Sequence, residues 1–341
     1  RPRHAASHQI PRRIGIEMSS VSKDFPRPRL TTRASAGANH IAILLATYNG
    51  AKMLPAQLDS IERQTHKDWS LLVSDDGSCD ETRRILRAFA AKLPDKRIAL
   101  IRGPGQGSAQ NFLSLLRASG RVPFVAFADQ DDVWFNDKLA RAIVQLSPLT
   151  HPAIYGSATL VTDHDLQPLR PSMTFKRPTG FQNALVQNVA GGNTMVMNRL
   201  ALNALQPASL LAKGIVAHDW WCYQMVTGMG GEMIYDPVPS LLYRQHQDNQ
   251  IGANDTLKAR VSRLKRLLRG EFSQWRNAHF KALSAAENWL TDDAKQTLSR
   301  CAGLSSSRIS RRFFALHVSG LYRQTALGSA ALRLATLIGR V

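Results

Sequence analysis

The chain has 341 residues, of which 44% are hydrophobic and 20% are charged, and its formal net charge at pH 7 is +19. This composition is typical of a globular protein, and three cysteines without metal-ligand spacing exclude a disulfide scaffold and favour a reducing, cytosolic compartment. The positive charge lies at the two ends, because residues 1–40 carry a net +6, residues 251–341 carry +11 and residues 41–250 only +2. The charge therefore belongs to the flanks of the chain rather than to its patterned middle.

Residues 1–40 are rich in Pro, Ser and Arg and show no periodicity, so we expect a disordered basic extension. The N-terminus lacks the apolar segment of a signal peptide. Arg323 and Arg333 interrupt the apolar C-terminal stretch, so no apolar run reaches the roughly 18 residues that span a membrane. We expect a cytoplasmic protein that is not integral to a membrane.

From residue 41 on, apolar strands alternate with amphipathic helices. The predicted strands cover 41–49, 69–78, 98–103 and 122–132, and the predicted helices cover 52–64, 80–93, 108–119 and 137–146. Nearly continuous apolar strands predict an α/β fold with a single Rossmann-like, mostly parallel sheet covered by helices on both faces. Beyond residue 150 the pattern is mixed, with strands predicted in 153–163, 192–198 and 232–246, a helix around 218–226 and basic helices in 255–341.

Three polar clusters follow three of the predicted strands: TYNG (47–50), DDGS (75–78) and DQDD (129–132). In parallel sheets, ligands bind beyond the carboxyl ends of the strands, where these clusters fall. Carboxylate oxygens are the ligands that Mg²⁺ and Mn²⁺ prefer, so Asp129 and Asp131 fit a metal and a sugar-nucleotide hydroxyl. The alternative is a solvated acidic turn, which an isolated Asp-x-Asp more often forms.

Three further motifs each allow a functional and a structural interpretation. Asp75 and Asp76 form either a turn or an acceptor for the ring N–H of a pyrimidine. Asp219 in HDWW is either a general base beside two Trp rings or the N-cap of a helix with a buried Trp pair. Arg244 and His246 in YRQH suit phosphate binding, or are ordinary surface residues.

Taken together and in order, these motifs resemble those of the family 2 glycosyltransferases of the GT-A fold, above all the bacterial rhamnosyltransferase-like members. The matching stretches are LLATYNG, VSDDGS, ADQDDVW with Lys138-Leu139, GGNTMVMN, HDWW, and YRQH with Asn249 and Gly252. The resemblance implies a catalytic domain at 41–252, with a nucleotide-sugar-binding half at 41–150 and an acceptor-binding half at 151–252. The extension 1–40 and a helical basic region at 253–341 lie outside it. Cys79 stands where that group more often has Thr or Ser.

For the nucleotide, the resemblance implies that Thr47, Tyr48 and Asn49 line the pocket and that Asp76 accepts a hydrogen bond from the pyrimidine base. It also implies that Asp129 contacts the donor ribose or sugar.

For the reacting groups, the resemblance implies that Asp131 and Asp132 hold Mg²⁺ or Mn²⁺ against the pyrophosphate. Asp219 is then the general base of an inverting transfer, and Arg244 and His246 meet the donor phosphate or close a loop over it.

The implied enzyme moves a sugar from a nucleotide-sugar donor to a saccharide or lipid-linked saccharide in cell-surface polysaccharide synthesis, with dTDP-rhamnose as the first donor to expect. Two alternatives remain. A nucleotidyltransferase uses the same carboxylates and metal, although HDWW and YRQH then have no role. A basic nucleic-acid-binding protein is the other, although aromatic-rich basic motifs are absent and we expect no nucleic acid as a partner.

The segment LKARVSRLKRLLRG (257–270) combines an apolar face with six Lys and Arg side chains. Such a helix fits an anionic membrane surface, here the cytoplasmic face of the inner membrane. The alternative is a charged helix that packs on its own catalytic domain.

Overall fold

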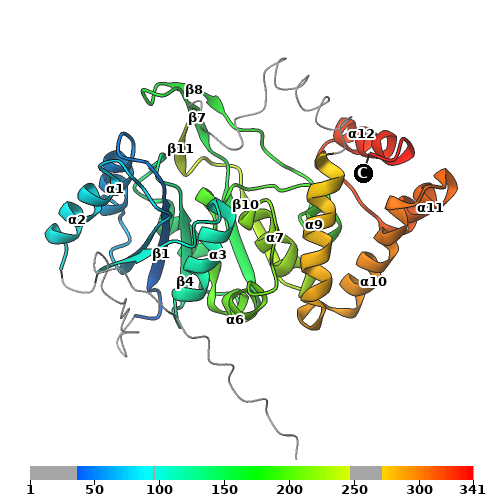
Figure 1. The fold of residues 1–341 in the computed structure, drawn as a ribbon, viewed down its shortest axis with the longest axis horizontal. Helices are drawn as coiled ribbons and strands as arrows, with labels where there is room; N and C mark the ends of the chain where they lie inside the picture. The colour runs from blue at the N-terminus through cyan, green and yellow to red at the C-terminus, as the bar shows by residue number, and fades with distance from the viewer. Residues whose placement is uncertain (1–36, 95–96, 246–270, 341) are drawn as a thin grey trace, which may run out of the picture.

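A computed structural model of the protein describes residues 37–94, 97–245 and 271–340 (Figure 1). Seven strands form the main sheet, in the order β10 (Glu232–Asp236), β6 (Ala153–Ser157), β9 (Val196–Asn198), β4 (Phe124–Ala128), β1 (Ile41–Thr47), β2 (Trp69–Asp75) and β3 (Ile98–Arg102). All neighbouring strands are parallel except β9, which runs antiparallel to both β4 and β6. The predicted mostly parallel α/β sheet is confirmed.

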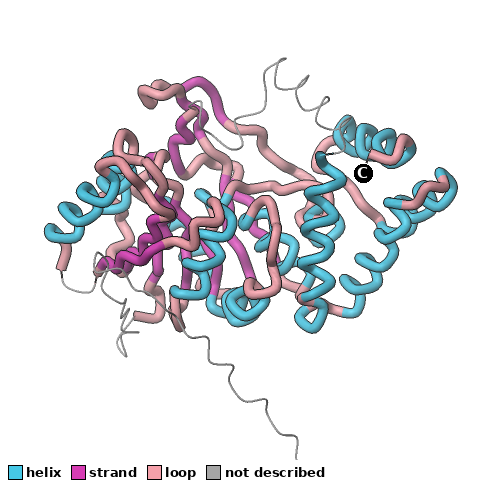
Figure 2. Tube along the Cα trace, viewed as in Figure 1, coloured by secondary structure: helices cyan, strands magenta, loops and turns pink. Residues whose placement is uncertain are grey.

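Two layers of helices cover the sheet, which lies in the middle of the molecule (Figure 2). Ile41, Ile43 and Leu45 of β1 face one layer and Ala42 and Leu44 face the other, because side chains alternate along a strand. The first layer contains α1 (Leu54–Glu62), α2 (Thr82–Lys92) and α4 (Lys138–Leu146). The second contains α3 (Ser108–Ala118), α5 (Phe181–Ala184), α6 (Arg199–Ala208) and α7 (His218–Gly228). Burial on both faces explains why the central strands are apolar throughout.

Beside the main sheet lies a second sheet that the sequence does not predict, with the order β5 (Val133–Trp134), β11 (Leu241–Arg244), β7 (Leu160–Thr162) and β8 (Pro168–Pro171). Two of its strands, β7 and β11, come from predicted strands that are longer than the observed ones, whereas β5 and β8 lie outside the predicted strands. The strand predicted at 122–132 ends at Ala128, and 153–163 divides into β6 and β7. The segment 232–246 divides into β10 and β11, because Pro237 and Pro239 between them cannot donate to a ladder.

Helices α9 (Glu271–Ala285), α10 (Asp292–Cys301), α11 (Ile309–Ser319) and α12 (Ala326–Leu337) follow β11 along the chain. Their apolar side chains, such as Leu283 and Leu316, belong to the same buried cluster as Trp221 of α7. The predicted basic helix at 257–270 and most of the N-terminal extension lie outside the described residues. Within the described residues, no helix is both long and apolar enough to cross a membrane.

Candidate active site

The loops after β1 and β2 are joined through the buried carboxylate of Asp75. Its Oδ1 accepts hydrogen bonds from Thr47 Oγ1 at 3.2 Å and from Ser78 Oγ at 2.5 Å. Its Oδ2 accepts from the Ser78 amide at 3.1 Å and forms an ion pair with Arg83 Nε at 2.7 Å. A carboxylate with this many partners is a structural junction, so Thr47 is positioned by Asp75.

Tyr48 is held by an amide side chain from the DQDD turn. Gln130 Oε1 accepts from the Tyr48 amide at 2.9 Å, and Gln130 Nε2 donates to the Tyr48 carbonyl at 2.9 Å. A Cβ atom on Gly50 would lie 2.2 Å from Gln130 Oε1, so a larger residue at this position would displace the Gln130 amide from Tyr48. The pairing leaves the Tyr48 ring 59% exposed at the edge of the sheet, where a ligand can contact it.

Asn49 connects the first loop to the start of α2. It has a left-handed backbone (φ 47°), and its Oδ1 accepts from the Cys79 amide at 2.9 Å. The Cys79 Sγ donates to the same Asn49 oxygen at 3.5 Å. Asp80 Oδ1 accepts from the Thr82 amide at 3.0 Å, although the N-cap residue of α2 is Glu81 rather than Asp80.

Asp76 holds the glycine-rich loop that follows β3. Its Oδ1 accepts from the Gly105 amide at 2.6 Å and its Oδ2 from the Gly107 amide at 3.2 Å. Gly105 and Gly107 have φ values of 67° and 84°, which other residues adopt rarely. Asp76 thus fixes one wall of the edge beside Thr47 and Tyr48, and its oxygens retain lone pairs that a ligand can use.

The DQDD turn brings three carboxylates into one cluster. Oxygen atoms of Asp129, Asp131 and Asp132 all lie within 4.8 Å of one another. Burial, together with the charges of Asp131 and Asp219, raises the pKa of Asp129 from its ordinary value to about 8. Asp219 therefore lies close enough to interact with this turn. Carboxylates this close to one another repel and therefore favour protonation. A cation bound among them removes that repulsion and is stabilising.

Asp132 is fully buried and only partly satisfied. Its Oδ2 accepts from Asn193 Nδ2 at 2.6 Å, whereas its Oδ1 has no hydrogen-bond partner among the described residues. Burial raises its pKa well above the ordinary value, and the charges of Asp131 and Asp129 add to that effect. An orphaned oxygen beside two further carboxylates fits a divalent metal ion, since hard cations take oxygen ligands.

Lys138 is a buried cation on the opposite side of Asp132. Its Nζ lies 4.1 Å from the centre of the Trp134 ring and has no hydrogen-bond partner among the described residues. Burial lowers the pKa of Lys138 to about 7, against the attraction of Asp132, which raises it. The lysine therefore offsets only part of the negative charge of the turn.

The registers of two antiparallel strand pairs explain which residues meet the DQDD turn. Leu242 of β11 pairs with Val133 of β5, so the next residues of β11 run back alongside the turn. Arg244 Nε accordingly donates to the Asp131 carbonyl at 3.0 Å. Ala126 of β4 pairs with Val196 of β9, which places the residues before β9 alongside the end of β4.

Asp219 lies in the first turn of α7. Its Oδ2 accepts from the Gly192 amide at 2.9 Å and its Oδ1 from the Trp220 amide at 2.7 Å. His218 stacks on Phe112 with ring centres 3.9 Å apart, which fixes the start of the helix against α3. Burial lowers the pKa of His218 to about 4, so this imidazole is neutral at pH 7.

The helix start tests the structural interpretation of HDWW. The N-cap position is Ala217, so Asp219 is not the cap. Trp220 and Trp221 are 6% and 0% exposed and belong to the core, as in the structural interpretation of the Trp pair. The Asp219 carboxylate therefore faces the DQDD turn while the two rings pack behind it.

The predicted residues from Thr47 to Arg244 thus lie along the carboxyl edge of the sheet, and His246 lies outside the described residues. Sequence reasoning assigned no role to three residues that organise this edge: Gln130, Lys138 and Asn193. All three occur inside the motifs DQDD, ADQDDVW…KL and GGNTMVMN, and membership of these motifs is the sequence feature that could have identified them. Their partners depend on strand register, which the motifs do not specify.

Comparisons with known proteins agree on the family. The family model described as Glycosyl transferase family 2 matches residues 42–202. The chain is 29% identical over 262 residues to the dTDP-rhamnosyl transferase RfbG of Shigella flexneri, which covers 73% of this chain and 86% of that protein. It is 32% identical over 168 residues to the UDP-Glc:alpha-D-GlcNAc-diphosphoundecaprenol beta-1,3-glucosyltransferase WfgD of Escherichia coli, covering 48% of this chain and 62% of that protein.

Among solved structures, residues 1–349 of S. aureus TarS in complex with UDP-GlcNAc match with a TM-score of 0.50 and 13% identity, covering 88% of this chain and 90% of that one. This likeness shows that the fold is that of the GT-A glycosyltransferases. The family model, the relatives and the fold agree: the chain is a glycosyltransferase, and its residues 42–202 match glycosyl transferase family 2.

Proposed function

We propose that the protein transfers a sugar, with inversion at the anomeric carbon, from a nucleotide-sugar donor to a saccharide or lipid-linked saccharide acceptor in polysaccharide synthesis. The observation that carries the proposal is the carboxylate cluster of the DQDD turn, with its orphaned Asp132 oxygen, beside Asp219. A sugar-nucleotide site needs a cation to balance the diphosphate, and a base for the attacking hydroxyl.

The donor lies along the ends of β1, β2 and β4. The exposed Tyr48 ring covers the base, while Thr47 and Asn49 form the floor of the pocket and Asp76 accepts from the base. Asp129 contacts the ribose or the transferred sugar. The Arg244 guanidinium, held against the Asp131 carbonyl, lies where a diphosphate oxygen can accept from it.

Asp131 and Asp132 hold the metal ion. When bound, Mg²⁺ or Mn²⁺ supplies positive charge to the diphosphate as it leaves. Asn193 and the Arg244 main chain orient Asp132 for this role, since hydrogen bonds from both lower its pKa and favour the ionised form.

Asp219 takes the proton of the acceptor hydroxyl as that oxygen forms the bond to the anomeric carbon. The bond from the anomeric carbon to the diphosphate oxygen breaks, and its electron pair leaves with the nucleoside diphosphate. The Gly192 and Trp220 amides hold the two carboxylate oxygens of Asp219 in place, so the base needs no rearrangement to act. Gly192 also admits the close approach of His218, since a Cβ there would lie 2.5 Å from His218 Nε2.

The donor proposed first is dTDP-rhamnose, because the named function of a relative that covers most of both chains is dTDP-rhamnosyl transfer. UDP-glucose is the second candidate, since a shorter match is to a UDP-Glc glucosyltransferase. We further propose that residues 41–252 are the catalytic domain and that the basic region 253–341 associates with the cytoplasmic face of the inner membrane.

A donor panel with product analysis tests the reaction. Thermal shift with dTDP-rhamnose, UDP-glucose and UDP-GlcNAc, with and without Mn²⁺, identifies the donor as the compound that stabilises the protein only with the metal. Turnover of that donor then releases a nucleoside diphosphate, and NMR of the product gives the inverted anomer. Release of inorganic pyrophosphate instead identifies a nucleotidyltransferase and overturns the proposal.

A further inference from the structure

Helix α11 presents an apolar outer face that no other described element covers. Its inner face is formed by Ala315, Leu316 and Ser319, which are buried. The opposite face carries Ile309, Phe313 and Phe314, which are 59%, 60% and 66% exposed. Helical spacing places these three side chains within about 140° of one another on one side of α11, with Ser310 and His317 between Phe313 and Phe314 around the helix.

Helix α12 has the same organisation. Leu327, Leu334 and Ile338 are 82%, 62% and 50% exposed, and Ala331 between them is also exposed. The spacing of four, three and four residues places all of them on one side of the helix. The two helices contact each other at the end of the molecule opposite to α1 and α2 (Figure 1). We call the outer faces of α11 and α12 together the terminal apolar surface.

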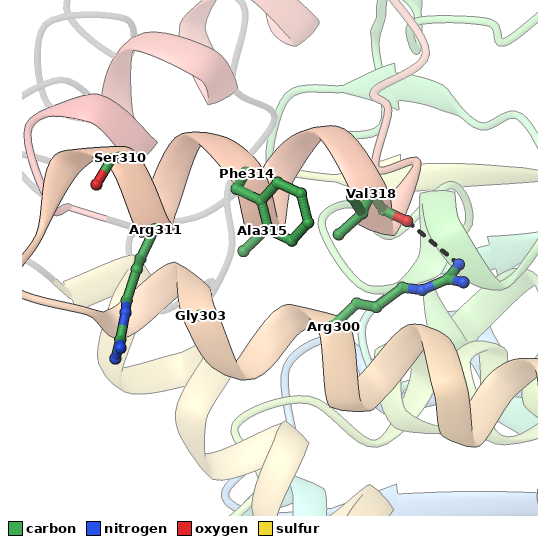
Figure 3. A pocket seen from close by; sticks show the side chains of 7 residues that line it. All are labelled: Arg300, Gly303, Ser310, Arg311, Phe314, Ala315 and Val318. Atoms are coloured by element: carbon green, nitrogen blue, oxygen red, sulfur yellow. Dashed lines mark hydrogen bonds between the residues drawn. The ribbon is translucent and has the colours of Figure 1, made fainter.

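The terminal apolar surface lies in a strongly basic part of the chain. Residues 294–341 contain one lysine and seven arginines and no Asp or Glu. Arg308 at the N-cap of α11 and Arg311 in its first turn are exposed, as are Arg333 on α12 and Arg340 just after that helix. A pocket of about 410 Å³ between α10 and α11 has both basic and apolar side chains in its lining. They include Arg300, Arg311, Phe314 and Val318 (Figure 3).

We propose that the terminal apolar surface docks the enzyme on an anionic membrane, with Phe313, Phe314 and the leucines of α12 at the level of the lipid headgroups. Apolar side chains flanked by arginines have the chemistry that interfacial helices use on anionic lipid. A two-fold dimer through the same surface is disfavoured, because it sets the arginines of one copy against those of the other without acids to pair them. The inference rests on the proposed membrane association and assigns it to named side chains.

A chain of contacts connects the terminal apolar surface with the catalytic base. Asn183 of α5 donates to the carbonyl of Tyr322, just before α12, at 3.1 Å. Asn183 Oδ1 accepts from the Tyr223 hydroxyl at 3.0 Å, and Tyr223 lies one helical turn after Asp219 on α7. Docking therefore holds Asp219 at a defined height above the membrane, where the saccharide of a lipid-linked acceptor is presented.

Vesicle co-sedimentation of the full chain, without donor or acceptor, tests the proposal. We expect binding to vesicles of phosphatidylcholine with about 30% phosphatidylglycerol, much weaker binding to pure phosphatidylcholine, and a decrease with salt. Phe313→Ser with Phe314→Ser should lower the partition coefficient at least tenfold. Arg308→Glu with Arg311→Glu should remove the preference for phosphatidylglycerol. The control, Val144→Ser with Leu210→Ser, removes two exposed apolar side chains elsewhere, on α4 and after α6, and should bind as wild type.

The outcomes separate this inference from the proposed reaction. Circular dichroism and donor turnover on a soluble acceptor report whether each variant is folded and active, and both should match wild type. Absence of vesicle binding by an active wild-type enzyme overturns the docking proposal alone, as does equal loss in the control. A dimer by light scattering that Phe313→Ser with Phe314→Ser dissociates, without vesicle binding, assigns the surface to a second copy instead. Vesicle binding with no sugar transfer contradicts the proposed reaction and leaves docking supported.

Discussion

Replacement of Asp219 by asparagine tests the base most directly, because the change is isosteric and the contacts of both oxygens are known. In the wild type each carboxylate oxygen accepts from a different main-chain amide, Gly192 and Trp220. Asparagine has a single oxygen, so its NH₂ group must face one of these N–H donors. The lost hydrogen bond lowers the free energy of unfolding by about 1–3 kcal/mol.

The expected loss of activity is larger than the loss of stability. Removal of a general base costs on the order of 10²–10⁴ in rate, which corresponds to about 3–5 kcal/mol in the activation barrier. Asp219 is held by the Gly192 and Trp220 amides and not by the residues proposed to contact the nucleotide, so donor affinity should change little. The variant is therefore expected to lose kcat and to keep its affinity for donor.

Stopped assays of nucleoside diphosphate release at saturating donor, with calorimetry of donor binding, measure both quantities. Asp80→Asn is a matched control, because Asp80 also accepts one main-chain hydrogen bond on each oxygen, from Thr82 and Ala51. It should lose similar stability and keep its kcat. Near-normal turnover of Asp219→Asn refutes the assignment of the base, and an equal loss of kcat in Asp80→Asn attributes the effect to stability.

Three further predictions concern the donor side. Asp131→Ala should weaken donor binding in the presence of Mn²⁺ and not in its absence; calorimetric affinities that are the same with and without Mn²⁺ in the wild type contradict the metal role. Because the pKa of Asp129 is raised to about 8 and that of Asp132 well above its ordinary value, protons compete with the metal at pH 7, and Mn²⁺ affinity should rise between about pH 6 and 8. Calorimetry in buffers of different ionisation enthalpy should show proton release, and zero release is incompatible with these shifts. Gln130→Ala removes two hydrogen bonds to Tyr48 worth about 1–3 kcal/mol together, so donor KM should rise by up to roughly a hundredfold at nearly constant kcat. Gln130→Glu keeps one of the two hydrogen bonds, and its KM should lie between those of the wild type and Gln130→Ala. An unchanged KM in both variants contradicts the role of Gln130 in positioning Tyr48.

The fold was predictable because the strands that form the centre of the sheet are apolar on both faces. β1, β2 and β4 each end within a few residues of a polar cluster, which locates TYNG, DDGS and DQDD at one edge. The physical basis is simple: a strand buried on both sides has few polar residues until it leaves the core.

The partners of the site residues were not predictable in the same way. β9 enters the sheet antiparallel between β4 and β6, and only that register brings Asn193 to Asp132. The contact of Arg244 with the Asp131 carbonyl likewise depends on the pairing of β11 with β5 in a second sheet. Pairings between strands distant in sequence follow from packing of the whole chain, which local patterns do not encode.

Helix α7 has a practical consequence for protein engineering, because it serves two parts of the molecule at once. Its first turn carries Asp219, and its buried side chains Trp221 and Tyr223 belong to a core that continues through α9 to α12. In chimeras with related enzymes, the segments proposed to bind the donor are therefore easier to exchange than those proposed to bind the acceptor. The loops after β1 and β2 are joined through Asp75 and Asn49 and have to be exchanged together, whereas any exchange that divides α7 from α9–α12 opens the core. A graft of the acceptor side has to carry all these helices together.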